Sequence, residues 1–210
     1  GGASGSFLTE NKLDTLIDYE ELRGISAVLG SGSFIIIDDS TCMVDLVRYY
    51  MDFMHKESCG KCIPCREGTG RMLEILDNVV KRPANDDAGT TLERFKGVMQ
   101  LETIASVMKD TSLCGLGQGA PNPVESTLKH FRDEYEAHIL EKRCPAKVCK
   151  ALIRYQIIEN TCTGCTVCAR NCPVTCISGE KRKPHEIDQL RCVKCGRCFE
   201  ICRFGAVKKI

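Results

Sequence analysis

Residues 162–173 read CTGCTVCARNCP, and residues 192–203 repeat the pattern as CVKCGRCFEICR. Each stretch holds three cysteines separated by two residues and a fourth cysteine after three more, and the two stretches are offset by 30 positions. Sulfurs this close in sequence cannot sensibly form disulfides with one another, but they can converge on one inorganic iron–sulfur cluster. The spacing therefore predicts a duplicated, cluster-binding unit over residues 153–210.

This duplicated unit resembles the bacterial two-cluster ferredoxin module, in which the fourth cysteine of each run ligates the other cluster. Carried over by position, the resemblance implies two [4Fe–4S] clusters with crossed ligands. The first cluster takes Cys162, Cys165, Cys168 and Cys202, and the second takes Cys192, Cys195, Cys198 and Cys172. Arg203 stands where the usual proline follows the fourth cysteine, a change that removes no ligand. The alternative is a pair of zinc sites, because Cys-x-x-Cys pairs also bind zinc.

A second set of cysteines lies in residues 58–68 (SCGKCIPCREG), 112–117 (SLCGLG) and 120–123 (APNP). These motifs resemble the cluster domain of the NADH-binding flavoprotein subunit of complex I. They resemble more closely the flavoprotein subunit of NAD(P)-linked, electron-bifurcating [FeFe] hydrogenases, which carries an appended two-cluster ferredoxin. This resemblance covers nearly the whole chain and implies a third [4Fe–4S] cluster, bound by Cys59, Cys62, Cys65 and Cys114. A redox-inert zinc site with four thiolates is the alternative.

Apolar residues at helical spacing surround this second set of cysteines. They predict helices over four segments: 41–56, 66–81, 92–108 with a break near Gly97, and 122–139. A loop at 84–90 and a glycine-rich turn at 114–123 connect them. Short connections favour an antiparallel four-helix bundle over residues 41–143, and in such a bundle Cys114 and the stretch 59–65 lie on two turns at one end.

The first 40 residues are predicted to be the end of a small α/β domain, with a strand at 33–37. The resemblance implies that this domain is ubiquitin-like and that the FMN and NAD(P) sites lie on an upstream segment. The sequence has no Gly-x-Gly-x-x-Gly stretch and opens on GGASG, so we expect a piece of a longer polypeptide that does not bind NADH alone. The overall fold class is thus α+β.

Four cysteines remain after twelve are assigned to clusters, and one histidine accompanies three of them. The bundle argument places the start of the first helix beside the end of the fourth, opposite the cluster. Three thiolates and one imidazole there suit structural zinc. These candidate ligands are Cys42, His138, Cys144 and Cys149. The alternative is three buried thiols and a surface histidine. Residues 144–152 are predicted to be a hinge before the ferredoxin-like unit, and the zinc ion is expected to fix the start of this hinge.

The remaining thiol and imidazoles are assigned ordinary roles. Cys176 is interpreted as a small buried apolar residue rather than a ligand. Three histidines are interpreted as ordinary surface or cluster-adjacent residues: His55, His130 and His185.

Charge is unevenly distributed along the chain. Residues 141–210 hold 15 Lys and Arg against 6 Asp and Glu, a net charge of +9, whereas the whole chain has +1. A basic tail often indicates nucleic acid, but thiolate-ligated clusters are anionic and compensate this charge locally. No apolar run approaches the ~20 residues of a membrane span, and no signal peptide is visible. We therefore expect a cytoplasmic protein that inserts into no membrane and binds no nucleic acid.

The predicted function is electron relay through three clusters, between an upstream flavin and a ferredoxin or a hydrogenase partner. No side chain is predicted to perform acid–base or nucleophilic catalysis. The same module in an NAD-dependent formate dehydrogenase or a complex I-like enzyme is one alternative. A zinc-stabilised interaction or nucleic-acid-binding module is the non-enzyme alternative.

Overall fold

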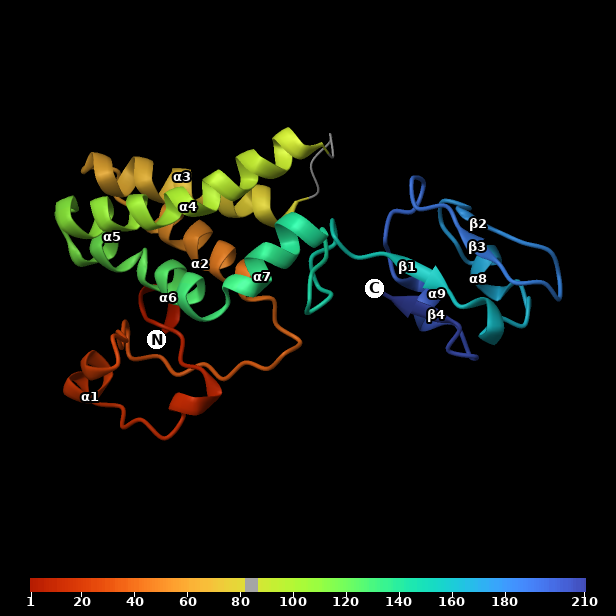
Figure 1. The fold of residues 1–210 in the computed structure, drawn as a ribbon, viewed down its shortest axis with the longest axis horizontal. Helices are drawn as coiled ribbons and strands as arrows, with labels where there is room; N and C mark the ends of the chain where they lie inside the picture. Colours follow the sequence, from red (N-terminus) through yellow and green to blue (C-terminus); the bar gives the residue numbers. More distant parts are fainter. Residues whose placement is uncertain (82–86) are drawn as a thin grey trace. The chain divides into compact units, whose positions relative to one another are not determined.

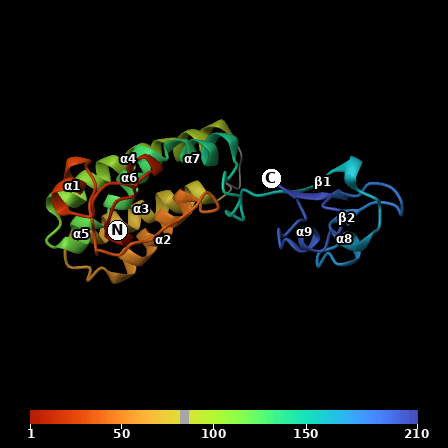
Figure 2. The same cartoon turned by 90° about the horizontal axis from the view of Figure 1, so that it is seen from below.

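A computed structural model describes residues 1–81 and 87–210. The chain divides into two compact units, Gly1–Ala151 and Leu152–Ile210 (Figure 1). The first unit is helical and the second is a small cysteine-rich unit with short strands, as the view turned by 90° also shows (Figure 2). Among the described residues, no helix combines the length and the apolar character that crossing a membrane requires.

Four helices of the first unit pack against one another in pairs: α2 on α3, α3 on α4, α4 on α6 and α6 on α2. The helical elements in chain order are η1 (Gly2–Ser4), η2 (Glu10–Lys12), α1 (Tyr19–Gly24), α2 (Met43–Glu57), α3 (Ile63–Val80), α4 (Ala88–Thr111), α5 (Gly115–Gly119), α6 (Asn122–His130), α7 (Arg132–Glu136) and the π-helical turn η3 (Ala137–Glu141).

The core of this unit forms where the apolar faces of α2 and α3 meet. On α2, Val44, Val47 and Met51 recur at the spacing of one helical face and are buried. On α3, Met72 and Leu76 are fully buried in the same way. Burial of these side chains supplies the main stabilisation of a helix pair, since helix propensity alone is marginal at this length.

The segment before α2 differs from the expected α/β element. Residues 33–37 form no strand, so the prediction of a strand there is wrong. Phe34 and Ile36 are 68% and 84% exposed. A strand needs a partner for its backbone groups, and both sheets of the described residues lie in the second unit. A β-branched run is therefore not sufficient to make a strand here.

Several helix boundaries also differ from the predictions. The helix expected at residue 66 begins at Ile63, with Pro64 in its first turn. Helix α4 runs without a break past Gly97 and begins at Ala88, so it takes in the end of the loop expected at 84–90; residues 84–86 lie outside the described residues. The glycine-rich stretch expected as a turn contains the short helix α5.

The last helix of the first unit is interrupted rather than continuous. Phe131 has φ −135° and ψ 35°, which is not helical and separates α6 from α7. After α7 the backbone widens into the π-helical turn η3, which ends at Lys142 in a left-handed conformation. The segment predicted as one helix from 122 to 139 is therefore three short elements, and π-helical turns of this kind are frequent at functional sites.

The second unit is built from two equivalent halves. Its elements are β1 (Tyr155–Ile157), η4 (Glu159–Thr161), α8 (Val167–Arg170), β2 (Ile177–Ser178), β3 (Glu186–Ile187), α9 (Arg197–Glu200) and β4 (Val207–Lys209). β1 pairs antiparallel with β4, and β2 with β3, so the outer strands of the unit meet and the inner strands meet. The small core between them includes Ile157, Ile177, Ile187 and Val207.

Candidate metal centres

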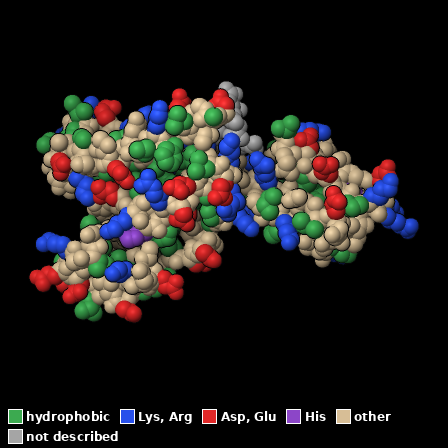
Figure 3. Space-filling view, viewed as in Figure 1, with side chains coloured by type: hydrophobic (Ala, Val, Ile, Leu, Met, Phe, Trp, Pro, Cys, Tyr) green, Lys and Arg blue, Asp and Glu red, His purple; other side chains and the backbone are tan. Residues whose placement is uncertain are grey.

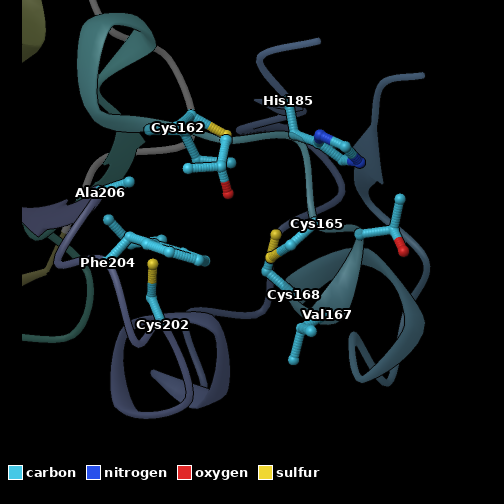
Figure 4. A pocket seen from close by; sticks show the side chains of 12 residues that line it. Cys162, Cys165, Val167, Cys168, His185, Cys202, Phe204 and Ala206 are labelled. Carbon is cyan, nitrogen blue, oxygen red and sulfur yellow. The ribbon is translucent and has the colours of Figure 1, made fainter. Parts of the chain in front are cut away.

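The two halves of the second unit exchange one cysteine each. One cavity, named here the first cavity, is lined by three cysteines of the first run and one of the second: Cys162, Cys165, Cys168 and Cys202. Figure 4 shows these four labelled side chains around a common space. The second cavity is lined by Cys192, Cys195, Cys198 and Cys172, and by Cys176 as a fifth cysteine. The structure therefore groups the eight thiols in the crossed sets that the resemblance implied.

Repeated backbone turns produce this grouping. Thr166 and Gly196 both adopt left-handed conformations, with φ of 64° and 80°, immediately before α8 and α9. Each turn ends the extended segment that carries two cysteines and starts the short helix that carries the third. Gly196 also lies against the Tyr155 ring, where an added Cβ would be 3.0 Å from the hydroxyl oxygen. Four thiols facing one small apolar cavity are the donor set that a cubane cluster uses.

The two cavities differ in the residues that line them at equivalent positions. His185 lines the first cavity and Tyr155, 30 positions earlier, lines the second. His185 is buried, its Nδ1 lies 3.1 Å from the carbonyl oxygen of Lys183, and Gly179 leaves room for its ring. Of the two roles considered for His185, the structure therefore supports the cluster-adjacent one and not the surface one. His55 and His130 are exposed.

A third group of cysteines, named here the helical site, lies where α2, α3, α4 and α5 meet. Cys62 is the N-terminal cap residue of α3, Cys65 lies in its first turn, and Cys114 precedes α5. The backbone N–H of Leu113 is the main cause that lowers the pKa of the Cys62 thiol. Burial raises the pKa of Cys65, as do the charges of Cys62 and Cys114. Cys62, Cys65 and Cys114 therefore lie close enough for their charges to interact, and Cys59 is exposed on the loop just before Cys62.

The close approach of α5 to α3 depends on a glycine. A Cβ added at Gly117 would lie 2.9 Å from the Cβ of Cys65 and 2.6 Å from the Cβ of Ser112. No larger residue fits this position without a shift of the backbone. Packing at Gly117 thus holds the start of α5, next to Cys114, close to α3.

The remaining four candidate ligands, named here the buried quartet, are close enough to share one metal ion. They are Cys42, His138, Cys144 and Cys149, and their ligand atoms all lie within 4.8 Å of one another. Cys42 Sγ is 3.3 Å from His138 Nε2 and 3.6 Å from Cys149 Sγ. Cys149 Sγ is 3.4 Å from His138 Nε2. Tetrahedral zinc, with Zn–S of about 2.3 Å and Zn–N of about 2.0–2.1 Å, sets ligand separations of about 3.5–3.8 Å.

The fold prepares the histidine of the quartet for a metal. Nδ1 of His138 donates to the carbonyl oxygen of Glu134 at 2.6 Å, which leaves Nε2 as the ligand atom. The side chain is fully buried, at 0% exposure. Arg94 donates to the carbonyl oxygens of Asn78 and Val79, at 2.9 and 2.7 Å, and to that of His138 at 3.4 Å. These bonds fix the η3 turn to the end of α3.

The thiols of the quartet influence one another's protonation. Hydrogen bonds from Cys149 and Cys42 lower the pKa of Cys144 far below its ordinary value. The hydrogen bond to Cys144 raises the pKa of Cys42 to about 12, and the pKa of Cys149 is raised for the same reason. Metal binding at this site releases protons, because cysteine ligates a metal as the thiolate.

Comparison with known families matches both parts of the chain. Residues 45–138 match the NADH-ubiquinone oxidoreductase-F iron–sulfur binding region. Residues 161–206 match the 4Fe-4S dicluster domain. The chain joins an oxidoreductase F-type iron–sulfur region to a 4Fe–4S dicluster domain. The resemblance to an F-type iron–sulfur region with an appended two-cluster domain is confirmed. The F-type match contains the cysteines of the helical site, and the dicluster match contains those of both cavities.

Individual relatives agree with this identification. The NADP-reducing hydrogenase subunit HndC of Solidesulfovibrio fructosivorans is 46% identical over 209 residues, which is 100% of this chain and 41% of that protein. An F-type NADH-quinone oxidoreductase subunit of Rhizobium meliloti is 39% identical over 145 residues, 69% of this chain and 32% of the relative. A crystal structure of an NAD+-reducing [NiFe]-hydrogenase aligns with a TM-score of 0.53 and 27% identity, over 66% of this chain and 22% of that one.

These relatives are subunits of oxidoreductases, and the chain spans about two fifths or less of the length of each. The HndC match extends over 100% of the chain and so includes the dicluster domain, whereas the match to the F-type relative from Rhizobium meliloti covers 69% of the chain. The chain is accordingly similar to an iron–sulfur part of subunits from NADP-reducing hydrogenase and NADH-quinone oxidoreductase.

Sequence reasoning did not single out every residue that matters at these sites. Arg94 and Glu134, which support His138, carry no motif. Arg94 reaches the carbonyl oxygen of His138 from 44 positions away, and Glu134 contributes only its backbone carbonyl to the His138 ring, which any residue at that position could supply. Cys176 lies 3.5 Å, sulfur to sulfur, from Cys172, closer to a candidate ligand than its assignment as an apolar filler implied. The 30-residue repeat could have revealed it, since the other half has Ala206 at this position.

Proposed function

We propose that the chain relays electrons through three [4Fe–4S] clusters, one at the helical site and one in each cavity. Each cluster supplies reversible one-electron transfer when bound, and the chain's thiolates hold it and set its potential. The observation that carries the proposal is the crossed grouping of eight thiols into two cavities of the second unit, in a chain whose first unit holds a separate helical site. A redox-inert pair of zinc sites leaves this duplicated, crossed arrangement without a purpose.

The proposed context is an electron-bifurcating, NAD(P)-dependent [FeFe] hydrogenase. Electrons would pass between FMN and NAD(P)H sites on an upstream segment and a ferredoxin or another subunit of the complex. The match to HndC supports a hydrogenase over a complex I-like enzyme or a formate dehydrogenase, because it covers 100% of the chain and includes the dicluster domain. The F-type relative from Rhizobium meliloti matches only 69%.

In this proposal the helices of the first unit act as an antiparallel four-helix bundle with the cluster at one end. The packing of α2, α3, α4 and α6 in pairs supports this arrangement. Helices α2 and α4 both end at the helical site, so the loop after each carries its cysteines. The ubiquitin-like character of residues 1–40 remains a proposal derived from the family resemblance.

Structural zinc on the buried quartet completes the proposal. The 3.3–3.6 Å separations among Cys42, His138 and Cys149 fit tetrahedral coordination, and complete burial suits a site without an open position. The second unit begins at Leu152, three residues after Cys149. Zinc would therefore anchor the base of residues 144–152, which serve as a hinge for the cluster-rich unit.

The non-enzyme alternative has less support. Figure 3 shows acidic and basic side chains interspersed on the drawn face of each unit, rather than a continuous basic surface of the kind that binds a phosphate backbone. A colourless protein that binds zinc alone would favour this alternative. A brown protein whose broad visible absorption bleaches on reduction favours the relay.

Metal and sulfide analysis of anaerobically prepared protein tests the proposal. We expect about twelve iron, about twelve sulfide and about one zinc per chain. Iron near four or below would contradict the three-cluster assignment. Zinc below about 0.2 per chain, with full iron, would contradict only the quartet assignment.

A further inference from the structure

The most informative difference between the two cavities lies in the turn that follows the exchanged cysteine. In the second cavity the turn runs from Cys172 to Cys176, and in the first from Cys202 to Ala206. The backbone is the same in both. The N–H of Thr175 donates to the carbonyl oxygen of Cys172 at 3.2 Å, and that of Gly205 to the carbonyl oxygen of Cys202 at 3.1 Å.

The third residue after the cysteine is left-handed in each turn, with φ of 49° at Thr175 and 61° at Gly205. Cys176 then leads into β2, which pairs with β3, and Ala206 leads into β4, which pairs with β1. Both residues are buried, at 4% and 2% exposure. The two side chains therefore occupy matched places, and they differ by a single thiol group.

Cys176 contacts the exchanged ligand twice. Its Sγ lies 3.5 Å from Cys172 Sγ, and its backbone N–H donates to that sulfur at 3.4 Å. A cysteine that ligates iron is a thiolate and carries no proton, so the S–H of Cys176 must be the donor of the sulfur–sulfur hydrogen bond. At the matched place in the first cavity, the methyl group of Ala206 cannot donate.

We propose that Cys176 is a positioning residue that raises the reduction potential of the cluster in the second cavity. The inference rests on the proposed cluster assignment and deepens it. Reduction adds negative charge to the cluster and its thiolates, and a hydrogen bond to a ligand sulfur stabilises the reduced form more than the oxidised form. Cys176 therefore contributes a bias that favours an electron on the second cluster over the first. The duplicated unit uses it to give its two similar clusters different potentials.

The test is a redox titration of the intact chain with all three clusters, followed by electron paramagnetic resonance, on wild type and Cys176→Ala. We expect the ratio of reduced to oxidised second cluster, at a fixed potential, to fall roughly fivefold. At about 59 mV per tenfold for one electron, this is a downward shift of about 40 mV. Cys176→Ser keeps a donor and should shift the potential less. The reciprocal Ala206→Cys should raise the potential of the first cluster.

Iron analysis of the same samples separates the outcomes. Loss of about four iron atoms in Cys176→Ala would show that Cys176 is a ligand and would overturn the tuning role. If Cys176→Ala keeps full iron and the reduction potential of its second cluster equals that of the wild type, the inference is wrong, but the proposed electron relay is unaffected. A wild type with iron near four contradicts the cluster assignment itself, and the inference falls with it.

Discussion

The helical site and the buried quartet both group cysteines within one unit, with a histidine added only in the quartet, and they differ in access to solvent. Cys59 and Cys114 of the helical site are exposed, whereas all four members of the quartet are buried. Helix α2 links the two, because Cys42 caps its start and Cys59 follows its end. Electron transfer requires a short path to a partner, whereas a structural ion gains from exclusion of water and competing ligands.

In the proposed assignment, the two ends of helix α2 contribute to two kinds of metal centre, a cluster site and a structural zinc site. At the quartet, Cys42 and Cys149 are 107 positions apart, so a metal there would close a long loop and stabilise the unit. At the helical site the thiols lie on loops and first turns, so their loss should disturb the core far less. The three experiments below test this division of roles.

The strongest test removes a ligand of the exposed site. Cys114→Ala should lower iron from about twelve to about eight per chain and abolish one cluster signal in electron paramagnetic resonance. The two clusters of the second unit should still reduce, because their thiols lie in a separate compact unit. Leu113→Ala, at an exposed neighbouring position, is the control and should keep full iron. Loss of all three signals would contradict the independence of the sites.

The second test removes two thiols of the quartet. Cys144→Ser/Cys149→Ser should lose zinc, keep about twelve iron, and lower the free energy of unfolding of the first unit by about 4–5 kcal/mol. Metal analysis and thermal unfolding measure the two effects. Wild-type affinity for zinc should also fall as the pH falls, because protons compete for the thiols. A double variant that unfolds like the wild type would show that the quartet is not a structural metal site.

The third test targets the support of the quartet rather than its ligands. Arg94→Ala removes bonds to the carbonyl oxygens of Asn78, Val79 and His138 and should cost about 2–3 kcal/mol of unfolding free energy. Zinc content should fall partly, and iron should stay constant. Arg94→Lys keeps the charge but loses the several N–H donors of the guanidinium group. Its free energy of unfolding should lie between those of the wild type and Arg94→Ala. An unchanged unfolding curve for Arg94→Ala would show that Arg94 does not stabilise the connection between α3 and the quartet.

Sequence reasoning was most successful where chemistry constrains spacing. The crossed sets of cysteines followed from a known ligation pattern, and the structure groups the same residues around two cavities. The quartet followed from helix order, even though α7 and η3 replace the expected straight helix before His138. An interruption at Phe131 does not move the end of the segment far from the start of α2.

Predictions were least successful where structure depends on partners distant in sequence. The run at 33–37 has the composition of a strand, but no described strand pairs with it. Gly115–Gly119 has the composition of a turn, yet packing of Gly117 against Ser112 and Cys65 supports a short helix. Local propensity is a weak prior in both cases, and tertiary contacts decide the outcome.

The exchange of cysteines between the two cavities also constrains how the second unit can be made. Cys202 lies 34 positions after Cys168, so the first cavity lacks its fourth thiol until synthesis has nearly reached the end of residues 1–210. A nascent chain that ends at residue 191 contains four thiols of the first run, but they belong to two different cavities. Neither half is a smaller ferredoxin, and a protease that cuts between the halves before a cluster is inserted would leave two fragments without a complete site. Although its sequence is a duplication, the proposed cluster assignment requires that both halves of the unit be synthesised before either site can be filled.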